Sequence, residues 1–289
     1  MGIKVAVSGI CGKTGALIAK KIFERETLTL ICGFERPGHL FVGSDFGELI
    51  KDGILNVPIY SSDNFEHIAR QETLDVVVDF TSASNSAGLV QKCAGVSVQV
   101  VMGTTGFSSQ QQSDMATQVK NSGISMVLSS NYGIAANVMF KIVSDAAKTL
   151  GRYDFDVEII DYHSRDKPDA PSGTAMALGK IVADAVGWDL LKVAKFGREH
   201  KNNHPVRDKK EIGFHSLRSG CVEGNGDPGI YLAENSIYFG GSWDRLDIAI
   251  HDYGMQAIVP GVLSAIEYLF INKNKANIFS MLDVLGLND

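Results

Sequence analysis

The chain has 289 residues, of which 45% are apolar and 21% charged, and its formal net charge is -6 at pH 7. A chain of this length and apolar content can bury a substantial core, which fits one large domain or two modest ones. The acidic balance argues against a general nucleic-acid binder, because the neutralisation of phosphates needs a basic face. We therefore expect a globular protein whose partners do not include a nucleic acid.

The first residues and the cysteines bear on the compartment. The apolar stretch in "MGIKVAVSGI" reaches glycine after too few residues for a signal peptide or a membrane span, so we expect no membrane association and a cytoplasmic location. Four cysteines are scattered along the chain without a CxxC pair, which predicts reduced thiols instead of disulfides or a thiolate zinc site. They are Cys11, Cys32, Cys93 and Cys221.

Short apolar runs alternate with helical patterns in the first half of the chain. The runs are rich in β-branched residues and end at Gly or Ser, which predicts buried strands at 3–9, 28–35, 75–80, 96–103 and 124–130. Helical spacing between them predicts helices at 13–24, 84–94 and 109–120. Near-continuous apolar strands separated by helices are typical of a parallel sheet that is covered on both faces.

After Asn131 the pattern changes. The sequence predicts a helix at 134–149, a strand in "FDVEIIDYH" (155–163), a helix at 172–186 and a dense set of alternating strands between 211 and 251. Because helices no longer separate the strands one by one, we expect an α+β unit with an open, largely antiparallel sheet. The tail "AIVPGVLSAIEYLF" returns to helical periodicity and is expected to pack on the first domain.

The glycine-rich stretch "SGICGKTGALIAKKI" follows the first strand and opens a helix. Glycines at Gly9, Gly12 and Gly15 would let the backbone turn tightly and approach a pyrophosphate, whose charge is met by free N–H groups at the helix N-terminus. Glu35 ends the second strand, where a carboxylate would accept hydrogen bonds from the adenosine ribose. Arg36 follows and is suited to a 2′-phosphate instead. The pair indicates that both NADH and NADPH are accepted.

Two other interpretations of this glycine-rich stretch are considered: a P-loop, which the sequence disfavours, and a purely structural turn, which stays open. A P-loop around "GKT" would need glycine where the chain has Val7, so ATP or GTP binding is disfavoured. The glycines would also be explained if they only shaped a strand-to-helix turn. The spacing G-x-x-G-x-x-G is not the commoner G-x-G-x-x-G, and by itself it is a weak signal.

Three further segments follow strands at the edge where ligand-facing loops of such a sheet lie. They are "DFTSAS" (79–84), "MGTTGFS" (102–108) and "SSNYG" (129–133). Small and hydroxylated residues leave room for a nicotinamide and its ribose and supply hydrogen bonds. Each is equally compatible with an ordinary loop or helix cap, because Ser, Thr and Asn favour caps.

The segment "DYHSRDKPDAPSGTA" (161–175) combines cations with a helix start. His163, Arg165 and Lys167 end an apolar strand, and Pro171 and Ser172 stand near the cap of the next helix. A helix N-terminus beside cationic side chains attracts carboxylates, and histidine titrates near neutrality and can exchange a proton. A solvated charged loop before a well-capped helix is the alternative.

These residues resemble a known family, the 4-hydroxy-tetrahydrodipicolinate reductases (dihydrodipicolinate reductases). The family signature E-x-x-x-x-H-H-x-x-K-x-D-A-P-S-G-T-A is represented by Glu158, His163, Lys167 and "DAPSGTA" from Asp169. Further family-like segments occur in the right order: "GSDFGEL" at 43–49, "VVDFT" at 77–81, "GTTGF" at 103–107 and "IGFHSLRSG" at 212–220. The resemblance covers nearly the whole chain.

The resemblance implies a two-domain fold and an activity. A Rossmann-type parallel-sheet domain is expected at 1–133 plus 253–289, and an α+β substrate and oligomerisation domain with an open mixed sheet at 134–252. The implied reaction is the NADH- or NADPH-dependent reduction of a pyridine dicarboxylate precursor, 4-hydroxy-tetrahydrodipicolinate, to tetrahydrodipicolinate in lysine and diaminopimelate biosynthesis. Relatives build a homotetramer through the second sheet, so a homotetramer is expected.

The resemblance also implies residue roles. His163 would donate or accept a proton and Lys167 would donate one. Substrate contacts are implied for Ser164, Ser172, Gly173 and Thr174. The positions that match the family's cofactor contacts are Gly9, Ile10, Cys11, Gly12, Lys13, Thr14, Glu35, Arg36, Gly103, Thr104, Thr105, Ser129, Ser130, Asn131 and Tyr132.

Several positions depart from the family pattern. Ser164 replaces the second histidine, which keeps a hydrogen-bonding group and removes a possible charge. Ser82 stands where relatives have arginine after "DFT", and Lys13 replaces an arginine in the glycine loop, so bidentate recognition of phosphate is lost. The segment 221–239 is longer than the usual hairpin, which weakens the tetramer expectation.

Two other functions remain open, and no metal site is expected. A semialdehyde or inositol-type dehydrogenase would share the architecture, but no cysteine is set as a nucleophile; a nicotinamide-binding sensor would bind cofactor without oxidising it. His200 and His204 are separated by asparagines before a proline, which indicates a loop and not a helical ligand pair. The other histidines form no ligand cluster in the sequence: His39, His67, His215 and His251.

Overall fold

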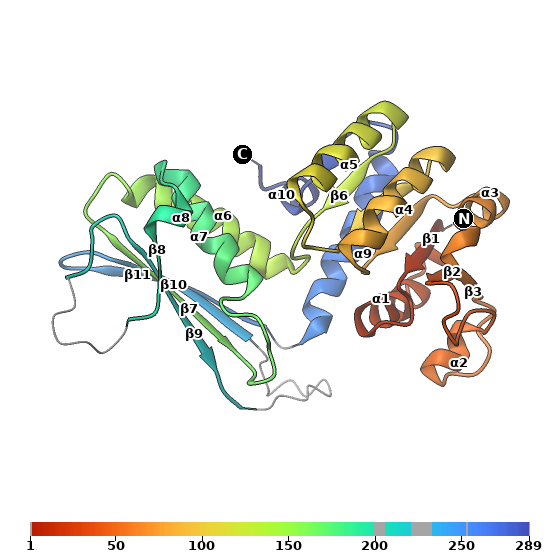
Figure 1. The fold of residues 1–289 in the computed structure, drawn as a ribbon, viewed down its shortest axis with the longest axis horizontal. Helices are drawn as coiled ribbons and strands as arrows, with labels where there is room; N and C mark the ends of the chain where they lie inside the picture. The colour runs from red at the N-terminus through yellow and green to blue at the C-terminus, as the bar shows by residue number, and fades with distance from the viewer. Residues whose placement is uncertain (1, 199–205, 221–232, 253, 289) are drawn as a thin grey trace. The chain divides into compact units, whose positions relative to one another are not determined.

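The structure is a computed structural model that describes residues 2–198, 206–220, 233–252 and 254–288. The chain separates into two compact units: residues 1–132 with 258–289, called unit 1, and residues 133–257, called unit 2. Both boundaries lie within a few residues of those expected from the sequence. Figure 1 shows the two units with their elements labelled.

Unit 1 contains a seven-stranded sheet in which every pair of neighbours is parallel, in the order β12-β6-β5-β4-β1-β2-β3. Strands β1 to β6 follow the order typical of a doubly wound dinucleotide-binding fold, and β12 extends the sheet beyond β6 at one edge. The predicted parallel sheet is therefore confirmed. The strands are β1 (Ile3–Ser8), β2 (Leu28–Glu35), β3 (Ile59–Ser61), β4 (Val76–Asp79), β5 (Gln99–Met102), β6 (Met126–Leu128) and β12 (Ile278–Phe279).

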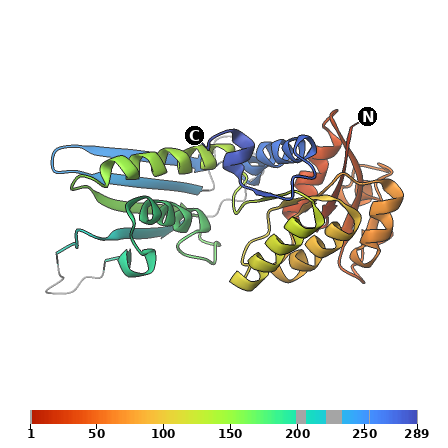
Figure 2. The same cartoon turned by 90° about the horizontal axis from the view of Figure 1, so that it is seen from above.

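Helices cover both faces of this sheet (Figure 1, Figure 2). One core contains side chains of α1 (Lys13–Phe23), α9 (Val259–Ile271) and α10 (Met281–Leu285). The other contains side chains of α3 (Phe65–Glu72), α4 (Ala83–Val96) and α5 (Ser109–Ser122). The C-terminal helices thus complete unit 1, as the periodicity of the tail indicates. Two short helices, α2 (Phe46–Ile50) and η1 (Ser62–Asn64), lie in the connections.

Unit 2 contains a five-stranded mixed sheet in the order β11-β10-β7-β9-β8. The strands are β7 (Asp156–His163), β8 (Ala194–Phe196), β9 (Ile212–Arg218), β10 (Ala233–Gly240) and β11 (Arg245–Asp252). The β7–β10 and β10–β11 pairs are antiparallel, but β7–β9 and β8–β9 are parallel. A mixed sheet is confirmed, whereas the expectation that it is largely antiparallel is wrong, because α7 and α8 form a crossover between β7 and β8.

Two long helices cover one face of this sheet: α6 (Ile134–Leu150) and α7 (Gly173–Val186). The short helix α8 (Leu190–Val193) follows α7, and η2 (Met255–Ile258) precedes α9. Inward side chains of β7, β9 and β10 form the apolar core with α6 and α7. The opposite face of the sheet carries half-buried and exposed side chains of alternate register, among them Ile160 and Leu217.

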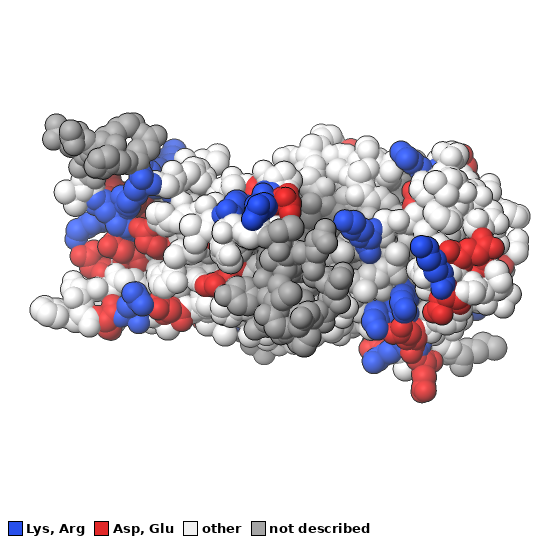
Figure 3. Space-filling model, turned by 90° about the horizontal axis from the view of Figure 1, so that it is seen from below, with Lys and Arg blue, Asp and Glu red and all other residues white. Residues whose placement is uncertain are grey.

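Some expectations lie partly outside the described residues. Cys221, the histidines at 200 and 204, and positions 221–232 of the longer segment are among them. Cys11, Cys32 and Cys93 are free thiols. Among the helices of the described ranges, none combines the length and apolar character that a membrane crossing needs. Figure 3 shows basic and acidic side chains beside one another on the viewed face.

Candidate active site and cofactor pocket

The glycine turn of unit 1 connects β1 to α1 in a conformation that requires glycine. Gly9 has φ +77°, and its N–H donates to the carbonyl of Phe34 at 2.9 Å. A Cβ on Gly15 would collide with the Gly9 carbonyl oxygen, so the helix packs against the turn only because Gly15 has no side chain. Gly12 caps α1 without a side-chain acceptor, and the first turn has no acidic residue. This helix start therefore suits a negatively charged group.

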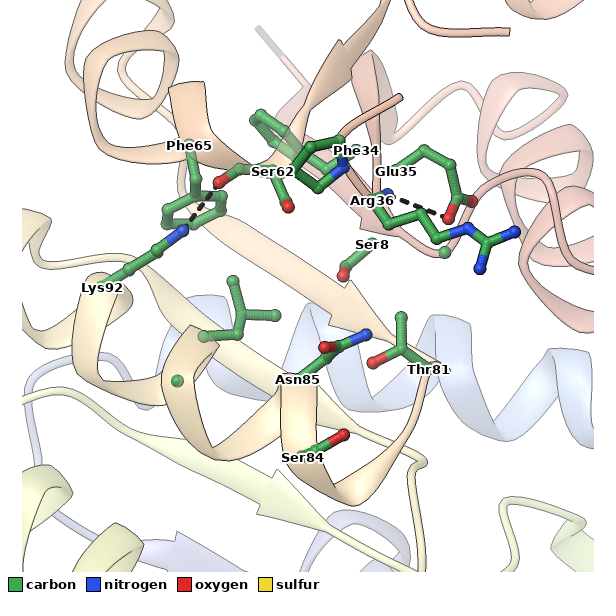
Figure 4. Close-up of a pocket in the computed structure, with 14 residues that line it drawn as sticks. Ser8, Phe34, Glu35, Arg36, Ser62, Phe65, Thr81, Ser84, Asn85 and Lys92 are labelled. Atoms are coloured by element: carbon green, nitrogen blue, oxygen red, sulfur yellow. Dashed lines mark hydrogen bonds between the residues drawn. The ribbon is translucent and has the colours of Figure 1, made fainter. Parts of the chain in front are cut away.

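A pocket of about 280 Å³ lies beside this turn at the carboxyl ends of β1 and β2 (Figure 4). Glu35 lines it and accepts hydrogen bonds from the N–H groups of Cys11 at 3.4 Å and Arg36 at 3.0 Å. On another side of the pocket, the Lys92 ammonium donates to the Ser62 carbonyl at 2.8 Å. The cavity, the open helix start and the strand-end carboxylate together fit the adenosine and pyrophosphate parts of a dinucleotide.

One group of possible metal ligands lies next to this pocket. The sequence indicates no ligand partner for His39, yet the structure brings possible ligand atoms of Cys11, Glu35 and His39 within 4.8 Å of one another. Burial, followed by the nearby Glu35 carboxylate, raises the pKa of the Cys11 thiol to about 12. At neutral pH the thiol is therefore protonated in the metal-free protein.

Asp79 holds the strand-end loops of unit 1 together. Its carboxylate is fully buried and accepts hydrogen bonds from the hydroxyls of Thr81 at 3.0 Å, Thr104 at 2.8 Å and Ser86. The Thr104 hydroxyl also accepts the Thr81 N–H at 2.9 Å. The hydroxyls in "DFTSAS" and "MGTTGFS" thus fix the two loops to one carboxylate, a role that the sequence patterns did not reveal.

The residues matched to cofactor contacts divide into buried and accessible side chains. Ile10 is fully buried, and Tyr132 is buried with its hydroxyl donating to the carbonyls of Met102 at 2.9 Å and Val127 at 3.1 Å. Any cofactor contact of these two residues, or of Thr104, would come mainly from the backbone. Side chains of the same set that are exposed or half-buried are Cys11, Lys13, Thr14, Glu35, Arg36, Thr105, Ser129, Ser130 and Asn131.

In unit 2, strand β7 carries its polar site on the helix-covered face. Residues on one face of a strand alternate, so Val157, Ile159, Asp161 and His163 share a face. The first two are core residues, while Asp161 is 1% exposed and has Asn235 of β10 and Ser216 of β9 as its register partners. A polar row therefore crosses the sheet where the apolar core ends.

Asp161 collects hydrogen-bond donors from three elements. Its Oδ2 atom accepts from the Ser172 N–H at 2.8 Å, the Arg218 Nη2 at 2.9 Å and the Ser216 hydroxyl at 3.2 Å. His163 Nε2 lies 2.8 Å from Oδ1. Burial by itself would raise the pKa of Asp161, but His163, Ser172 and Arg218 outweigh it and hold the pKa well below its usual range. Asp161 is thus an anion in the folded protein at neutral pH.

The start of α7 lies directly above this carboxylate. Ser172 is the N-cap: its hydroxyl accepts the Ala175 N–H at 3.2 Å and donates to Asn235 Oδ1 at 3.2 Å. Gly173 is exposed, Thr174 is half-buried, and the first turn has no acidic residue. The N-terminal end of a helix carries a partial positive charge, so this helix start favours an anionic group.

The loop between β7 and α7 brings the remaining predicted residues near. The Lys167 ammonium lies 2.9 Å from Asp169 Oδ1, and this pairing lowers the pKa of Asp169. Arg165 donates its backbone N–H and its Nε to the Gly220 carbonyl, at 3.0 and 3.2 Å. Ser164 accepts the Asp166 N–H at 3.3 Å, so its hydroxyl is used in the turn. The structure therefore groups His163, Ser172 and the Lys167 loop around one helix start.

Together the two units have the parts of an oxidoreductase that binds a dinucleotide in one domain and an anionic small molecule in the other. The chain belongs to the dihydrodipicolinate reductase family: the model of the family's N-terminus matches residues 3–132, and that of its C-terminus matches residues 135–285.

Relatives of known name resemble the chain over its whole length. The 4-hydroxy-tetrahydrodipicolinate reductase of Methanocaldococcus jannaschii is 37% identical over 99% of this chain and 98% of its own. The enzyme of that name from Methanothermobacter thermautotrophicus is 34% identical over 99% of this chain and 100% of its own. A dipicolinate-bound dihydrodipicolinate reductase structure from Paenisporosarcina sp. TG-14 has a TM-score of 0.73 at 25% identity, covering 98% of this chain and 99% of that one.

Proposed function

We propose that this chain reduces 4-hydroxy-tetrahydrodipicolinate to tetrahydrodipicolinate with NADH or NADPH, within lysine and diaminopimelate biosynthesis. The observation that carries the proposal is the match of both halves of the chain to one reductase family, with similarly named relatives at up to 37% identity over 99% of its length. The helix start of α7, next to His163 and Lys167, supports a dicarboxylate substrate. A sensor or another dehydrogenase would leave this anion site unexplained.

Different residues of unit 1 would bind different parts of the cofactor. A bound nicotinamide nucleotide supplies the hydride. We assign its pyrophosphate to the turn from Gly9 to Thr14 and its adenosine to the pocket beside Glu35. Glu35 would accept ribose hydroxyls, and the exposed Arg36 would meet a 2′-phosphate. Because both groups are present, we expect both cofactors to be used. Positions 103–105 and 129–132 border the nicotinamide end in this assignment.

Residues of unit 2 bind the substrate and move protons. Ser172, Gly173 and Thr174 would receive one substrate carboxylate at the start of α7, since its backbone N–H groups favour an anion. Lys167 would bind the substrate's negative charge and donate a proton, and His163 would exchange a proton. Ser164 is bound in its turn, so its contact with the substrate would need a hydroxyl rotation. No metal ion enters this scheme.

Assembly and location are parts of the same proposal. We expect a homotetramer built on the face of the second sheet that α6 and α7 leave uncovered, where Leu217 of β9 is 51% exposed and Ile160 of β7 and Tyr238 of β10 lie on the same face. A Leu217→Glu variant should then dissociate, which light scattering after gel filtration measures. A cytoplasmic location is a further part of this proposal.

The decisive experiment follows the absorbance of the reduced nicotinamide with freshly prepared 4-hydroxy-tetrahydrodipicolinate. We expect oxidation of both NADH and NADPH in parallel assays, each dependent on substrate. Cofactor binding without oxidation would favour a sensor, and oxidation with a semialdehyde or a polyol but not with the dicarboxylate would favour another dehydrogenase. An Arg36→Ala variant should lose NADPH turnover more than NADH turnover, while the Arg152→Ala control, at an exposed site in unit 2, should change neither.

A further inference from the structure

The two ring nitrogens of His163 have different surroundings. Nε2 is shielded from solvent and lies 2.8 Å from Asp161 Oδ1, but this pair is not aligned as a hydrogen bond, and neither atom has a hydrogen-bond partner in the described residues. The side chain as a whole remains 14% exposed. Nδ1 is therefore the nitrogen that is left to face a ligand, while Nε2 faces the protein.

The two carboxylate oxygens of Asp161 also differ. Oδ2 accepts three hydrogen bonds, from Ser172, Ser216 and Arg218, whereas Oδ1 has no aligned donor among the described residues and lies 2.8 Å from His163 Nε2. A buried carboxylate oxygen without a donor is costly, and so is a buried imidazole nitrogen without a partner. A proton on Nε2 would satisfy both atoms after a small rotation of the ring that aligns it with Oδ1. A proton on Nδ1 of the neutral ring would place a nitrogen lone pair against the carboxylate.

We infer that Asp161 is a positioning residue that keeps the proton of neutral His163 on Nε2, so that Nδ1 is the atom that exchanges a proton with the substrate. The inference rests on the proposed reductase function, in which His163 is the proton donor. In the step, the substrate, which has first lost its 4-hydroxyl group as water, accepts hydride and is left with an electron pair. The Nδ1–H bond of the imidazolium breaks, the substrate gains that proton, and His163 remains as the Nε2–H imidazole beside the Asp161 carboxylate. Water then returns a proton to Nδ1.

The same carboxylate also ties the proton donor to the anion-binding helix start. Asp161 accepts the N–H of Ser172, the N-cap of α7, while it faces His163, so one buried group sets the position of both. Packing makes this link stiff, because Asp161 is 1% exposed and also bound to Arg218. A substrate whose carboxylate binds at α7 would thereby be placed at a fixed distance from Nδ1.

Other charged groups face His163 from neighbouring strands. Arg218 is its register partner on β9, but the guanidinium is bound to Asp161 and to the Asp169 carbonyl. Asp252 of β11 lies in the same row beyond Ala233, and burial raises its pKa although His163 and His251 act against this. Asp252 is thus the second carboxyl group that influences the ring, and it provides a matched comparison for Asp161.

The first test needs no substitution in the site. Protein labelled with ¹⁵N at its histidines is measured by long-range ¹H–¹⁵N correlation at a pH where the rings are neutral, and the His163 signals are identified by their loss in His163→Ala. We expect Nε2 to be protonated and Nδ1 to be unprotonated. A neutral ring with its proton on Nδ1 overturns the inference, whatever the activity of the protein.

The second test compares three Asp-to-Asn variants by their tautomer and their pH profile. Asp161→Asn should mix the two tautomers, lower kcat by about 10- to 10³-fold, which is less than the about 10²- to 10⁴-fold that a positioned general acid supplies, and move the alkaline fall of kcat to lower pH. Asp252→Asn should keep the Nε2–H form and change kcat less than threefold. Asp184→Asn, on the exposed side of α7, is the control for an ordinary lost carboxylate.

The outcomes separate this inference from the proposed function. If His163→Ala is inactive while Asp161→Asn keeps the wild-type tautomer and pH profile, the inference fails and the function stands. If His163→Ala retains full turnover, the role of His163 itself is wrong. If Asp161→Asn does not fold, the tautomer of His163 in the wild-type protein decides whether the inference holds. A fall in kcat without a change of tautomer or pH profile would mean that Asp161 is only structural.

Discussion

Within the described residues, each unit has one almost fully buried carboxylate near the end of a strand, Asp79 and Asp161, and the two are held in different ways. Asp79 in unit 1 has hydroxyl partners, from Thr81, Ser86 and Thr104. Asp161 in unit 2 has Arg218, His163 and a helix N-terminus. Hydroxyl partners add no charge and connect loops, whereas cationic partners create a charged pair beside a ligand site. Asp79 is thus a carboxylate that fixes loops, whereas Asp161 is one that influences the protonation of His163.

The largest effects are expected from the proton-transfer residues of unit 2. His163→Ala and Lys167→Ala should each lower kcat by about 10²- to 10⁴-fold, the usual range for a positioned acid or base. Cofactor affinity should stay nearly unchanged, because the cofactor pocket is built from unit 1. Steady-state kinetics and titration with reduced cofactor measure the two properties separately. Wild-type turnover in either variant would remove that residue from the mechanism.

A stability experiment compares the two buried carboxylates directly. Asp161→Asn should lower the free energy of unfolding by about 3–5 kcal/mol, because the mostly buried Arg218 loses its partner charge. Asp79→Asn should cost less, about 1–3 kcal/mol, because the three hydroxyls can rotate to meet an amide. Denaturant unfolding of both variants gives the values. An equal or larger loss in Asp79→Asn would contradict the distinction between hydroxyl and cationic partners.

The acid dependence of stability should also depend on Asp161. Its pKa is depressed in the folded protein, so its contribution to stability is complete above the unfolded pKa of about 3.9 and is lost as the pH falls toward the folded pKa. Glu158 acts in the same direction: burial opposes ionisation, but His215 and Arg207 outweigh it and lower its pKa. The unfolding free energy of wild-type protein should fall below about pH 4, and less steeply in Asp161→Asn. Parallel slopes would show that Asp161 does not titrate as described.

Much of unit 1 could be predicted from sequence because its signals are local. The strands are continuous apolar runs, and the turn at Gly9 needs glycine for its positive φ. The region between β2 and β4 has no comparable local signal, since β3 has only three residues and its place at the sheet edge depends on pairing with β2. The formation of β3 therefore depends on tertiary pairing, which no local sequence pattern contains.

The site of unit 2 was only half predictable. His163, Lys167 and the Ser172 cap stand in one continuous segment, so they could be recognised together. Asp161 stands in the same segment, at a position where the alternation of "FDVEIIDYH" calls for an inward apolar residue, and that anomaly was a usable signal. Arg218 and Asn235 come from strands that are distant in sequence, and only the register of the mixed sheet brings them to Asp161.

The smallest effects should come from the starts of α7 and α1. The start of α7 has a side-chain cap, and the start of α1 has none. Ser172→Ala removes a side-chain cap from α7 and should cost about 1 kcal/mol of stability while raising KM for the dicarboxylate. Gly12→Ala alters a start that has no side-chain cap. Its φ of -74° is open to alanine, but the added methyl group would lie 3.3 Å from the Gly9 carbonyl oxygen, a close contact, so stability should fall by about 1 kcal/mol or less. The methyl group would lie on the exposed turn and should weaken cofactor binding. Unfolding curves together with KM for each ligand test both changes. If Gly12→Ala raised KM for the dicarboxylate while cofactor binding stayed intact, the assignment of the two helix starts to two different ligands would be wrong.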